Sequence, residues 1–272
     1  MRKVIQVPRD EEVVTLASDI VYGQRQEWCH AKYRQLRMSL MKPRCNYSYD
    51  EDKRYPLIVW LCGGSFAEVD RNVWIPELVY FAKQGFAVAA VDYSVIQLTR
   101  YPDQLVDVKE AIRYIRAHAE EFHIDPDRIA VMGESAGGYL SILAGVTGQD
   151  QTYDNGTYPE FSSEVQAVVA WYPCVEMEWL IPGRKDVNMA EDVENFPNLS
   201  GMVKEGMPPC LLLHGTADRL VPAKHSETLY RALEEKGNTV DLYLVEGADH
   251  ADRPFVKTEI KQIIADFLKQ YI

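Results

Sequence analysis

The chain has 272 residues, of which 41 are acidic and 29 are basic, and its formal net charge is −12 at pH 7. This acidic excess argues against a nucleic-acid partner, because binding to phosphate groups needs a basic surface. Hydrophobic residues make up 47% of the chain, which is ordinary for a globular protein whose length suits one large α/β domain or two small ones.

The cysteines and the N-terminus give an expectation about the compartment. The five cysteines are scattered, form no Cys-x-x-Cys pair, and are Cys29, Cys45, Cys62, Cys174 and Cys210. An odd and unpatterned set of this kind fits a reducing compartment. Charged residues interrupt the first twelve positions, so we expect no export signal there. No window approaches about 18 consecutive apolar residues, which argues against a membrane span. We therefore expect a cytoplasmic protein without a membrane partner.

The first part of the chain predicts one or two strands at the edge of a sheet and one in its core. Residues 1–30 mix charges with a short apolar run, and we expect an extended lead-in or an edge strand there. Residues 35–41 alternate polar with apolar side chains, which is the period of a half-buried strand. Residues 55–61 are almost continuously apolar, as in a strand that is buried on both faces.

The next elements alternate between helix and strand. A helix is predicted over residues 74–83 and a buried strand over residues 86–93. From residue 103 to residue 122, apolar side chains recur every three or four positions, so one helical face is apolar. The charged side chains between them are expected to form the solvated face of that helix, and they include Asp107, Lys109, Glu110 and Arg113.

Residues 129–138 carry the signal around which we interpret the rest of the chain. A short run of β-forming residues leads into Gly133-Glu134-Ser135-Ala136-Gly137, and a helix-forming stretch follows. Gly-x-Ser-x-Gly between a strand and a helix is the pattern of a nucleophile elbow, in which a strained turn lifts the serine hydroxyl above the sheet edge. A side chain at Gly133 or Gly137 would collide with the neighbouring strand or helix in so tight a turn.

The second half continues the alternation with one interruption. Strands and helices are predicted in turn over residues 165–171, 209–214, 222–235, 240–245 and 256–271. Residues 174–206 are acidic and aperiodic, and we predict an inserted cap or lid; a surface excursion without a role is the alternative. The whole pattern predicts one α/β domain over residues 1–272, with a mostly parallel sheet covered by helices on both faces.

Two later loops supply the partners that a nucleophilic serine needs. A serine hydroxyl is a poor nucleophile until a base takes its proton, and an acid must hold that base in the right tautomer. Asp218 follows the strand that ends at His214, and His250 follows the last predicted strand. Nucleophile, acid and base occur in this chain order in proteins with an elbow. Ser135, Asp218 and His250 are therefore predicted to be catalytic.

Other polar residues have weaker claims. Asp249 and Glu246 are rival acids, but adjacency to the base points Asp249 away from the imidazole that it would need to orient. The remaining histidines are interpreted as structural, and they are His30, His118, His123, His214 and His225. Because His118 and His123 lack the spacing of a zinc-binding helix, we expect no metal and no cofactor.

Backbone amides are the expected donors to the oxyanion that forms when an acyl bond is attacked. Gly63-Gly64-Ser65 follows the first buried strand, and glycines there let the backbone approach a substrate. Ala136, next after the nucleophile, is expected to provide a further amide. Cys62 is interpreted as a buried and inert thiol rather than a nucleophile.

Taken together, these residues resemble the α/β-hydrolase superfamily, and within it the esterase and lipase branch that carries a His-Gly-Gly motif ahead of a Gly-x-Ser-x-Gly elbow. The similarity covers roughly residues 55–270. Residues 124–138 and 214–222 are similar to the corresponding parts of small bacterial acetyl xylan and feruloyl esterases. The chain departs from the branch at Cys62, where His is usual, and at Ser94, where Arg is common.

The resemblance implies an α/β-hydrolase fold and the hydrolysis of small carboxylic esters through an acyl-enzyme. It also implies that the oxyanion hole consists of the amides of Gly64, Ser65 and Ala136. The predicted substrate is an acetylated or feruloylated plant-wall saccharide, taken as a small molecule or an oligosaccharide ester. Aromatic side chains predicted to contact its sugar or phenolic ring are Phe66, Trp171, Tyr172 and Trp179.

Two alternative functions stay open from the sequence. The same three residues could cleave an amide, as in arylformamidase-like or peptidase-like relatives. A non-catalytic binding protein that retains the fold is the alternative from a different class. The sequence is compatible with a homo-oligomer but does not decide the oligomeric state.

Overall fold

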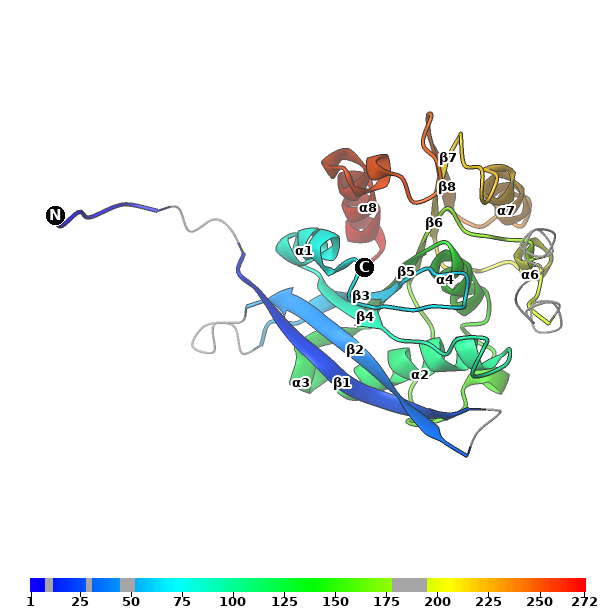
Figure 1. Cartoon of the computed structure of the whole chain (residues 1–272), viewed down its shortest axis with the longest axis horizontal. Coiled ribbons are helices and arrows are strands. Elements are labelled where there is room, and N and C mark those ends of the chain that lie inside the picture. The colour runs from blue at the N-terminus through cyan, green and yellow to red at the C-terminus, as the bar shows by residue number, and fades with distance from the viewer. Residues whose placement is uncertain (8–11, 28–30, 45–51, 178–194) are drawn as a thin grey trace.

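The structure is a computed structural model that describes residues 1–7, 12–27, 31–44, 52–177 and 195–272. A single eight-stranded sheet runs through it in the order β1-β2-β4-β3-β5-β6-β7-β8 (Figure 1). The strands are β1 Val14–Gln26, β2 Tyr33–Pro43, β3 Tyr55–Leu61, β4 Ala87–Val91, β5 Ile124–Glu134, β6 Ala167–Trp171, β7 Cys210–Gly215 and β8 Val240–Val245. β1 and β2 pair antiparallel, β2 pairs antiparallel with β4, and all other neighbours pair parallel.

Helices cover both faces of this sheet (Figure 1). They are α1 Ile75–Lys83, α2 Asp103–Ala117, α3 Ala119–Phe122, α4 Ala136–Val146, α6 Leu199–Met202, α7 Lys224–Glu235 and α8 Thr258–Tyr271, with 3-10 turns η1 Gln151–Tyr153 and η3 Arg253–Val256. Alternate side chains of β6 point to opposite faces, so Val168 and Ala170 pack with α2, α4 and α7, whereas Val169 and Trp171 pack with α1 and α8. The predicted mostly parallel α/β sheet is confirmed as an α/β-hydrolase fold.

The N-terminal part adds an antiparallel edge to the sheet. Residues 14–26, within the expected lead-in or edge strand, form β1 and pair with β2. The predicted helix over 103–122 divides into α2 and α3 at His118, and His123 ends it with a left-handed backbone. Of the predicted cap over 174–206, residues 178–194 lie outside the described part of the chain, so the cap stays a prediction.

The register of the parallel strands gathers their carboxyl ends at one edge. Leu61 at the end of β3 lies beside Gly133 of β5, and Gly133 lies beside Ala170 of β6. Further along, Gly215 at the end of β7 lies beside Val245 at the end of β8. The loops that follow these strands therefore leave the sheet on the same side, where open α/β sheets bind their ligands.

The charged face of α2 is buried, which contradicts the expectation that it is solvated. Arg25 of β1 lies over this helix and binds Asp107 through Nε at 2.7 Å and Glu110 through Nη2 at 3.1 Å. Burial raises the pKa of Asp107 to about 6, although Arg25 acts in the opposite direction. The edge strand β1 covers these carboxylates, and the helical periodicity of the sequence cannot predict this contact.

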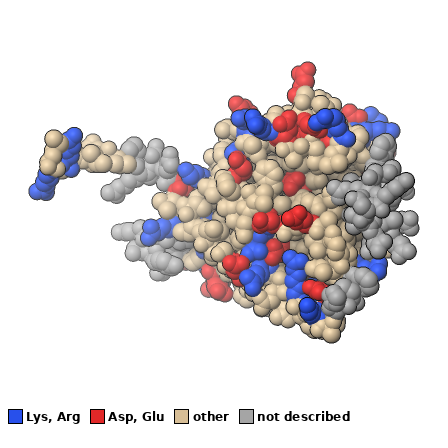
Figure 2. All heavy atoms as spheres, viewed as in Figure 1, with Lys and Arg blue, Asp and Glu red and all other residues tan. Residues whose placement is uncertain are grey.

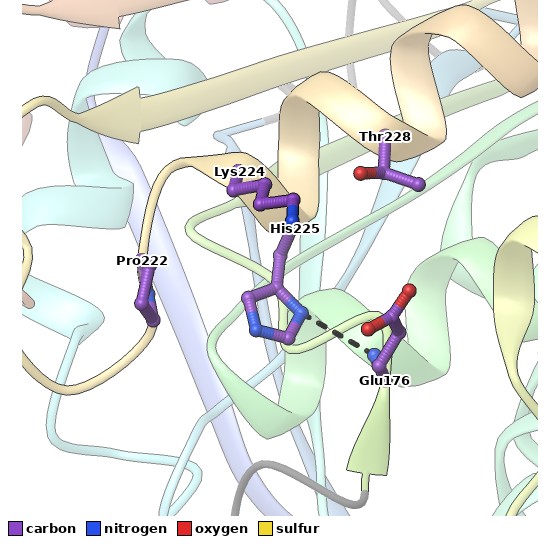
Figure 3. A pocket seen from close by; sticks show the side chains of 5 residues that line it. All are labelled: Glu176, Pro222, Lys224, His225 and Thr228. Atoms are coloured by element: carbon purple, nitrogen blue, oxygen red, sulfur yellow. Dashed lines mark hydrogen bonds between the residues drawn. The ribbon is translucent and has the colours of Figure 1, made fainter.

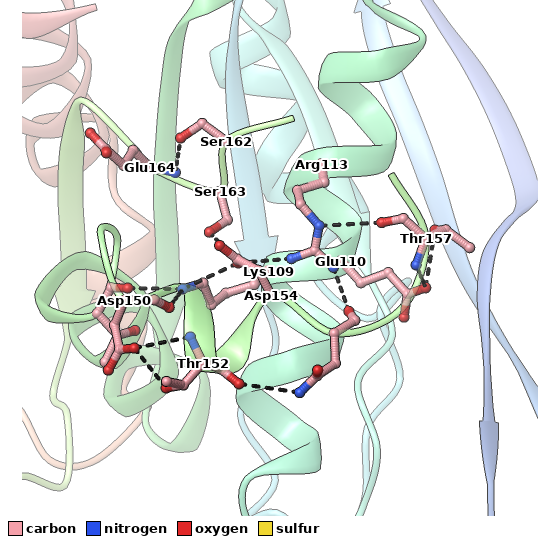
Figure 4. A network of polar contacts seen from close by, with 12 residues as sticks. Lys109, Glu110, Arg113, Asp150, Thr152, Asp154, Thr157, Ser162, Ser163 and Glu164 are labelled. Carbon is pink, nitrogen blue, oxygen red and sulfur yellow. Dashed lines mark hydrogen bonds and ion pairs between the residues drawn. The ribbon is translucent and has the colours of Figure 1, made fainter. Parts of the chain in front are cut away.

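The other charged side chains of α2 lie under the segment that follows α4. Arg113 binds the Asp154 carboxylate at 2.8 Å, and Lys109 lies 3.3 Å from the same oxygen (Figure 4). Lys109 also donates to the carbonyl oxygens of Thr147 and Asp150. Both cationic side chains are fully buried, and Asp154 is the carboxylate that both of them contact.

We predict that Asp154→Ala lowers the free energy of unfolding by about 3 kcal/mol, because removing one partner of a buried ion pair leaves the other charges uncompensated. Urea denaturation measures the change. Glu160→Ala, at an exposed position of the same segment, is the matched control and should change the stability by less than about 0.5 kcal/mol. Equal effects of the two substitutions would show that the buried pair does not stabilise the segment.

Candidate active site

Ser135 occupies a sharp turn between β5 and α4. Its backbone has φ of 53° and ψ of −116°, a conformation that costs energy and persists only where the surroundings enforce it. A Cβ on Gly133 would lie 2.5 Å from the backbone of Gly137, and one on Gly137 would lie 2.0 Å from the Leu61 carbonyl oxygen. The two glycines are therefore required by contact, and the turn has the geometry of a nucleophile elbow.

The structure brings Ser135, His250 and Asp218 into one hydrogen-bonded row. His250 Nε2 lies 3.0 Å from Ser135 Oγ, and His250 Nδ1 lies 2.7 Å from Asp218 Oδ2. Because an ionised carboxylate can only accept, the Nδ1 proton of His250 faces Asp218 and leaves Nε2 free to accept the serine proton. This is the arrangement that removes a proton from a serine nucleophile.

The Asp218 carboxylate is held ionised inside the protein. Burial by itself raises the pKa of Asp218, but hydrogen bonds from His214, His250 and the Val221 amide outweigh burial and hold the pKa well below its ordinary value. The amides of Leu220 and Val221 donate to Oδ1 at 3.0 and 2.8 Å. Oδ1 thus fixes the carboxylate to its own loop, and Oδ2 is directed to His250.

The loops that carry acid and base are tied to each other. Asp249 accepts hydrogen bonds from the Arg219 amide at 3.0 Å and from Arg219 Nε at 2.7 Å. Thr216 Oγ1 accepts from the Gly247 amide at 2.8 Å. The carboxylate of Asp249 is thus directed to Arg219, and Asp218 is the acid that contacts the imidazole of His250.

The Gly-rich turn after β3 has a backbone that requires glycine at Gly64. The φ of Gly64 is +127°, and a Cβ there would lie 1.8 Å from the Glu68 carbonyl oxygen. The Gly64 carbonyl accepts from the amides of Ala67 and Glu68, while Ser65 has a left-handed φ of 53°. Within the described residues, the amides of Gly64 and Ser65 donate to no protein acceptor. Ala136 begins α4, where amides have no intrahelical partner.

Glu134, next to the nucleophile, anchors the start of that turn. Its Oε1 accepts from the Gly63 amide at 2.5 Å and from Trp74 Nε1 at 3.2 Å. The Tyr93 hydroxyl donates to the Cys62 carbonyl at 2.6 Å. Burial raises the pKa of Glu134, and the donors from Gly63 and Trp74 oppose that rise. The turn is thus held by groups on both sides, although Cys62 stands where a His is usual.

The thiol of Cys62 fits its interpretation as inert. It is buried, and burial raises its pKa to about 12, with the nearby Glu134 carboxylate acting in the same direction. A thiol that stays protonated is a poor nucleophile. Sequence reasoning did not single out Glu134 as a functional residue; the departure at Cys62 was the one signal that another group had to hold the turn.

Three of the aromatic side chains predicted to contact the substrate are covered by protein, so their contact with a substrate stays a prediction. Trp171 is 1% exposed and packs against Trp60 at 5.4 Å between ring centroids. Phe66 and Tyr172 are both 0% exposed; Phe66 packs with Phe196, and Tyr172 lies 4.7 Å from the His250 ring. An aromatic side chain that follows a strand fills the core as readily as it lines a pocket. Trp179 lies outside the described residues.

A small cavity of about 70 Å³ lies beside the loop of the acid. The residues that line it are Glu176, Pro222, Lys224, His225 and Thr228 (Figure 3). His225 Nδ1 accepts from the amides of Val175 and Glu176 at 3.3 and 3.4 Å, and burial lowers the pKa of His225.

On the face drawn in Figure 2, basic and acidic side chains are interspersed.

No group of three or more His, Cys, Asp or Glu side chains within the described ranges is placed to hold a metal ion. None of the helices that the structure describes is both long enough and apolar enough to span a bilayer.

Comparison with proteins of known sequence identifies relatives that are named as esterases. Esterase LipC of Mycobacterium tuberculosis is 33% identical over 215 residues, which are 73% of this chain and 53% of LipC. The chain spans about half the length of the curated relatives it matches.

Solved structures with similar folds cover nearly the whole chain. Esterase 2 of Thermogutta terrifontis phosphoramylated by tabun has a TM-score of 0.76 at 25% identity over 94% of each chain. A truncated carbohydrate esterase from gut microbiota has a TM-score of 0.77 at 23% identity over 97% of this chain and 98% of its own.

The BD-FAE family model matches residues 46–233, which include β3 through most of α7 and contain Ser135 and Asp218. Because this match covers more than half of the sequence, the chain belongs to the BD-FAE family.

Proposed function

We propose that this protein is a carboxylic ester hydrolase that forms an acyl-enzyme on Ser135. The observation that carries the proposal is the row from Ser135 Oγ to His250 at 3.0 Å and from His250 to Asp218 at 2.7 Å, placed on an elbow that glycine contacts enforce. The family membership and the esterase names of its relatives support ester bonds as the target.

The mechanism follows from which atoms can give and take protons. His250 Nε2 takes the Ser135 proton while Oγ attacks the ester carbonyl carbon, and the resulting imidazolium faces the ionised Asp218. The carbonyl oxygen becomes an oxyanion, for which the amides of Gly64, Ser65 and Ala136 are the proposed donors. His250 then gives its proton to the alcohol oxygen as the C–O bond breaks. Water repeats the sequence on the acyl group and restores Ser135.

Positioning of two of those amides depends on the turn that Glu134 holds. Gly64 has a positive φ and Ser65 a left-handed backbone, and within the described residues neither amide donates to a protein acceptor. Successive N–H groups of this kind can bind an anion. The Glu134 side chain accepts from the amide of Gly63, the residue just before them. We infer that Glu134 performs the bracing role that a His has elsewhere in the branch.

For the substrate we propose acetyl esters of plant-wall saccharides in preference to feruloyl esters. The fold neighbour named a carbohydrate esterase supports a saccharide alcohol. Phe66, Trp171 and Tyr172, which were expected to contact a sugar or phenolic ring, are buried instead. A small acyl group needs no such surface. The described cysteines are free thiols, which supports action in a reducing compartment such as the cytoplasm.

We predict that p-nitrophenyl acetate is hydrolysed with a higher kcat/KM than methyl ferulate, N-formylkynurenine or an aminoacyl anilide. Ser135→Ala should lower kcat on the acetate about 10⁴-fold or more, because the nucleophile is lost. Initial rates over a range of substrate concentrations measure both quantities. Ser162→Ala, which removes an exposed serine hydroxyl, is the matched control and should behave as the parent does.

Each alternative function has its own outcome in that assay. Turnover restricted to N-formylkynurenine or the anilide would replace the esterase proposal by an amidohydrolase. An absence of turnover together with an absence of labelling by a fluorophosphonate probe would favour a non-catalytic binding protein.

We also predict that Glu134→Ala lowers kcat on p-nitrophenyl acetate about tenfold or more with little change in KM, because the turn that presents the oxyanion donors loses its anchor. Glu134→Gln keeps an oxygen that can accept from Gly63 and should lose less. Steady-state kinetics at one pH measure both variants, with Glu160→Ala as the control. A parent-like kcat in a folded Glu134→Ala variant would exclude the bracing role.

A further inference from the structure

His214, which the sequence analysis interpreted as structural, contacts the acid of the catalytic row. It lies in β7 and is fully buried. Its Nε2 lies 2.8 Å from the Val221 carbonyl oxygen and 3.3 Å from Asp218 Oδ2, and its Nδ1 lies 2.7 Å from Ser226 Oγ. Ser226 belongs to α7. The imidazole thus connects strand, catalytic loop and helix.

The neighbours of His214 determine where its proton lies. A carbonyl oxygen can only accept, so the Nε2 that faces Val221 carries a hydrogen. In the neutral ring Nδ1 is then an acceptor, and the Ser226 hydroxyl donates to it. That hydrogen bonds the Val221 carbonyl, and Asp218 Oδ2 lies 3.3 Å from the same nitrogen. A neutral His214 therefore presents a donor, not an acceptor, to the catalytic carboxylate.

Asp218 Oδ2 consequently lies near the N–H groups of two imidazoles. His250 donates at 2.7 Å and His214 lies at the longer distance of 3.3 Å. Each donor that a carboxylate oxygen accepts reduces its capacity to attract a further proton. The balance between the two donors sets both the orientation of Oδ2 and how strongly it holds the proton on His250.

We propose that His214, oriented by Ser226, is a positioning residue that fixes Asp218 and limits how strongly Asp218 holds the imidazolium form of His250. The proposal rests on the proposed function, in which His250 is the general base. The proton must leave His250 Nε2 for the alcohol in each cycle, so a carboxylate that holds the imidazolium too strongly shifts the acidic end of the working range upward. His214 keeps the carboxylate from doing so.

The other charged and titratable groups near His214 have other partners or other positions, and we assign the positioning of Asp218 to His214. His225, the neighbour of Ser226 in α7, accepts from two backbone amides through Nδ1, and burial lowers its pKa, which disfavours its charged form. Glu176 lies beside His225 (Figure 3). From β8, the residue paired with His214 is the apolar Leu244. Asp218 is the carboxylate in direct contact with the ring.

A purely structural role for His214 makes a different prediction. If the ring served only to join β7 to α7, its loss would lower the stability and the concentration of folded enzyme. The pH dependence of kcat/KM, measured on the enzyme that is folded, would not change. Positioning of Asp218 predicts a displaced pH profile in enzyme that is folded. The pH dependence of kcat/KM therefore separates the two roles.

The test compares His214→Met with His214→Gln in the full chain. Met fills the space without a donor, whereas the Gln amide can place an N–H near the Nε2 position. For p-nitrophenyl acetate we expect His214→Met to lower kcat/KM about tenfold and to move the acidic limb of its pH profile upward by about half a unit or more. His214→Gln should restore most of both. His118→Gln, which changes a histidine at the end of α2, is the control.

Ser226→Ala provides a second variant if His214→Met fails to fold. It removes the hydroxyl that orients the ring, and a smaller upward movement of the acidic limb is expected. An unmoved limb in folded His214→Met or, failing that, in Ser226→Ala would overturn the proposal, and so would a Gln variant no better than Met. His250→Ala and Ser135→Ala distinguish a failure of the proposed function from a failure of the His214 proposal. If either variant keeps the parental turnover, the proposed catalytic residues are wrong. If Ser135→Ala is inactive and the acidic limb of His214→Met does not move, only the proposed role of His214 is excluded.

Discussion

Crowding around the backbone of Ser135 is the constraint on which the rest of the site depends. Gly133 and Gly137 lie so close to each other and to the Leu61 carbonyl that no Cβ fits at either position. This closeness lets β5 pass into α4 through one residue held at a φ of 53°, a conformation that only surrounding contacts can maintain. The hydroxyl of Ser135 is therefore a fixed point, and every other group must be brought to it.

Contacts between the loops at the same sheet edge bring the other groups of the site to Ser135. Glu134 anchors the turn that leads to Gly64, and Arg219 on the acid's loop binds Asp249 beside the base. His214 reaches Asp218 from within β7. In each case a polar side chain from one strand end or loop fixes its neighbour. Groups fixed before the substrate arrives need no reorganisation during reaction, which is how preorganised polar sites stabilise developing charge.

Much of this was accessible from the sequence, because it depends on local pattern and chain order. Apolar runs and helical periods gave the strands and helices, and the order of Ser135, Asp218 and His250 after successive strands brought them together. The burial of Lys109 and Arg113 did not follow, since the segment that covers them is distant in the chain and has no period. The burial of Trp171 was missed for a related reason: alternation assigns its side chain to a face, but does not say what covers that face.

The most direct test of the account is to trap the acyl group on the enzyme. The protein is mixed with p-nitrophenyl acetate, quenched in acid within the first turnover, digested, and its peptides are analysed by mass spectrometry. An acyl-enzyme on Ser135 predicts one acetyl group on the peptide that contains Ser135, its accumulation at the acidic end of the activity range where deacylation is slow, and its absence from Ser135→Ala. Turnover with the acetyl group on another residue, or with Ser135 unmodified throughout, would contradict it.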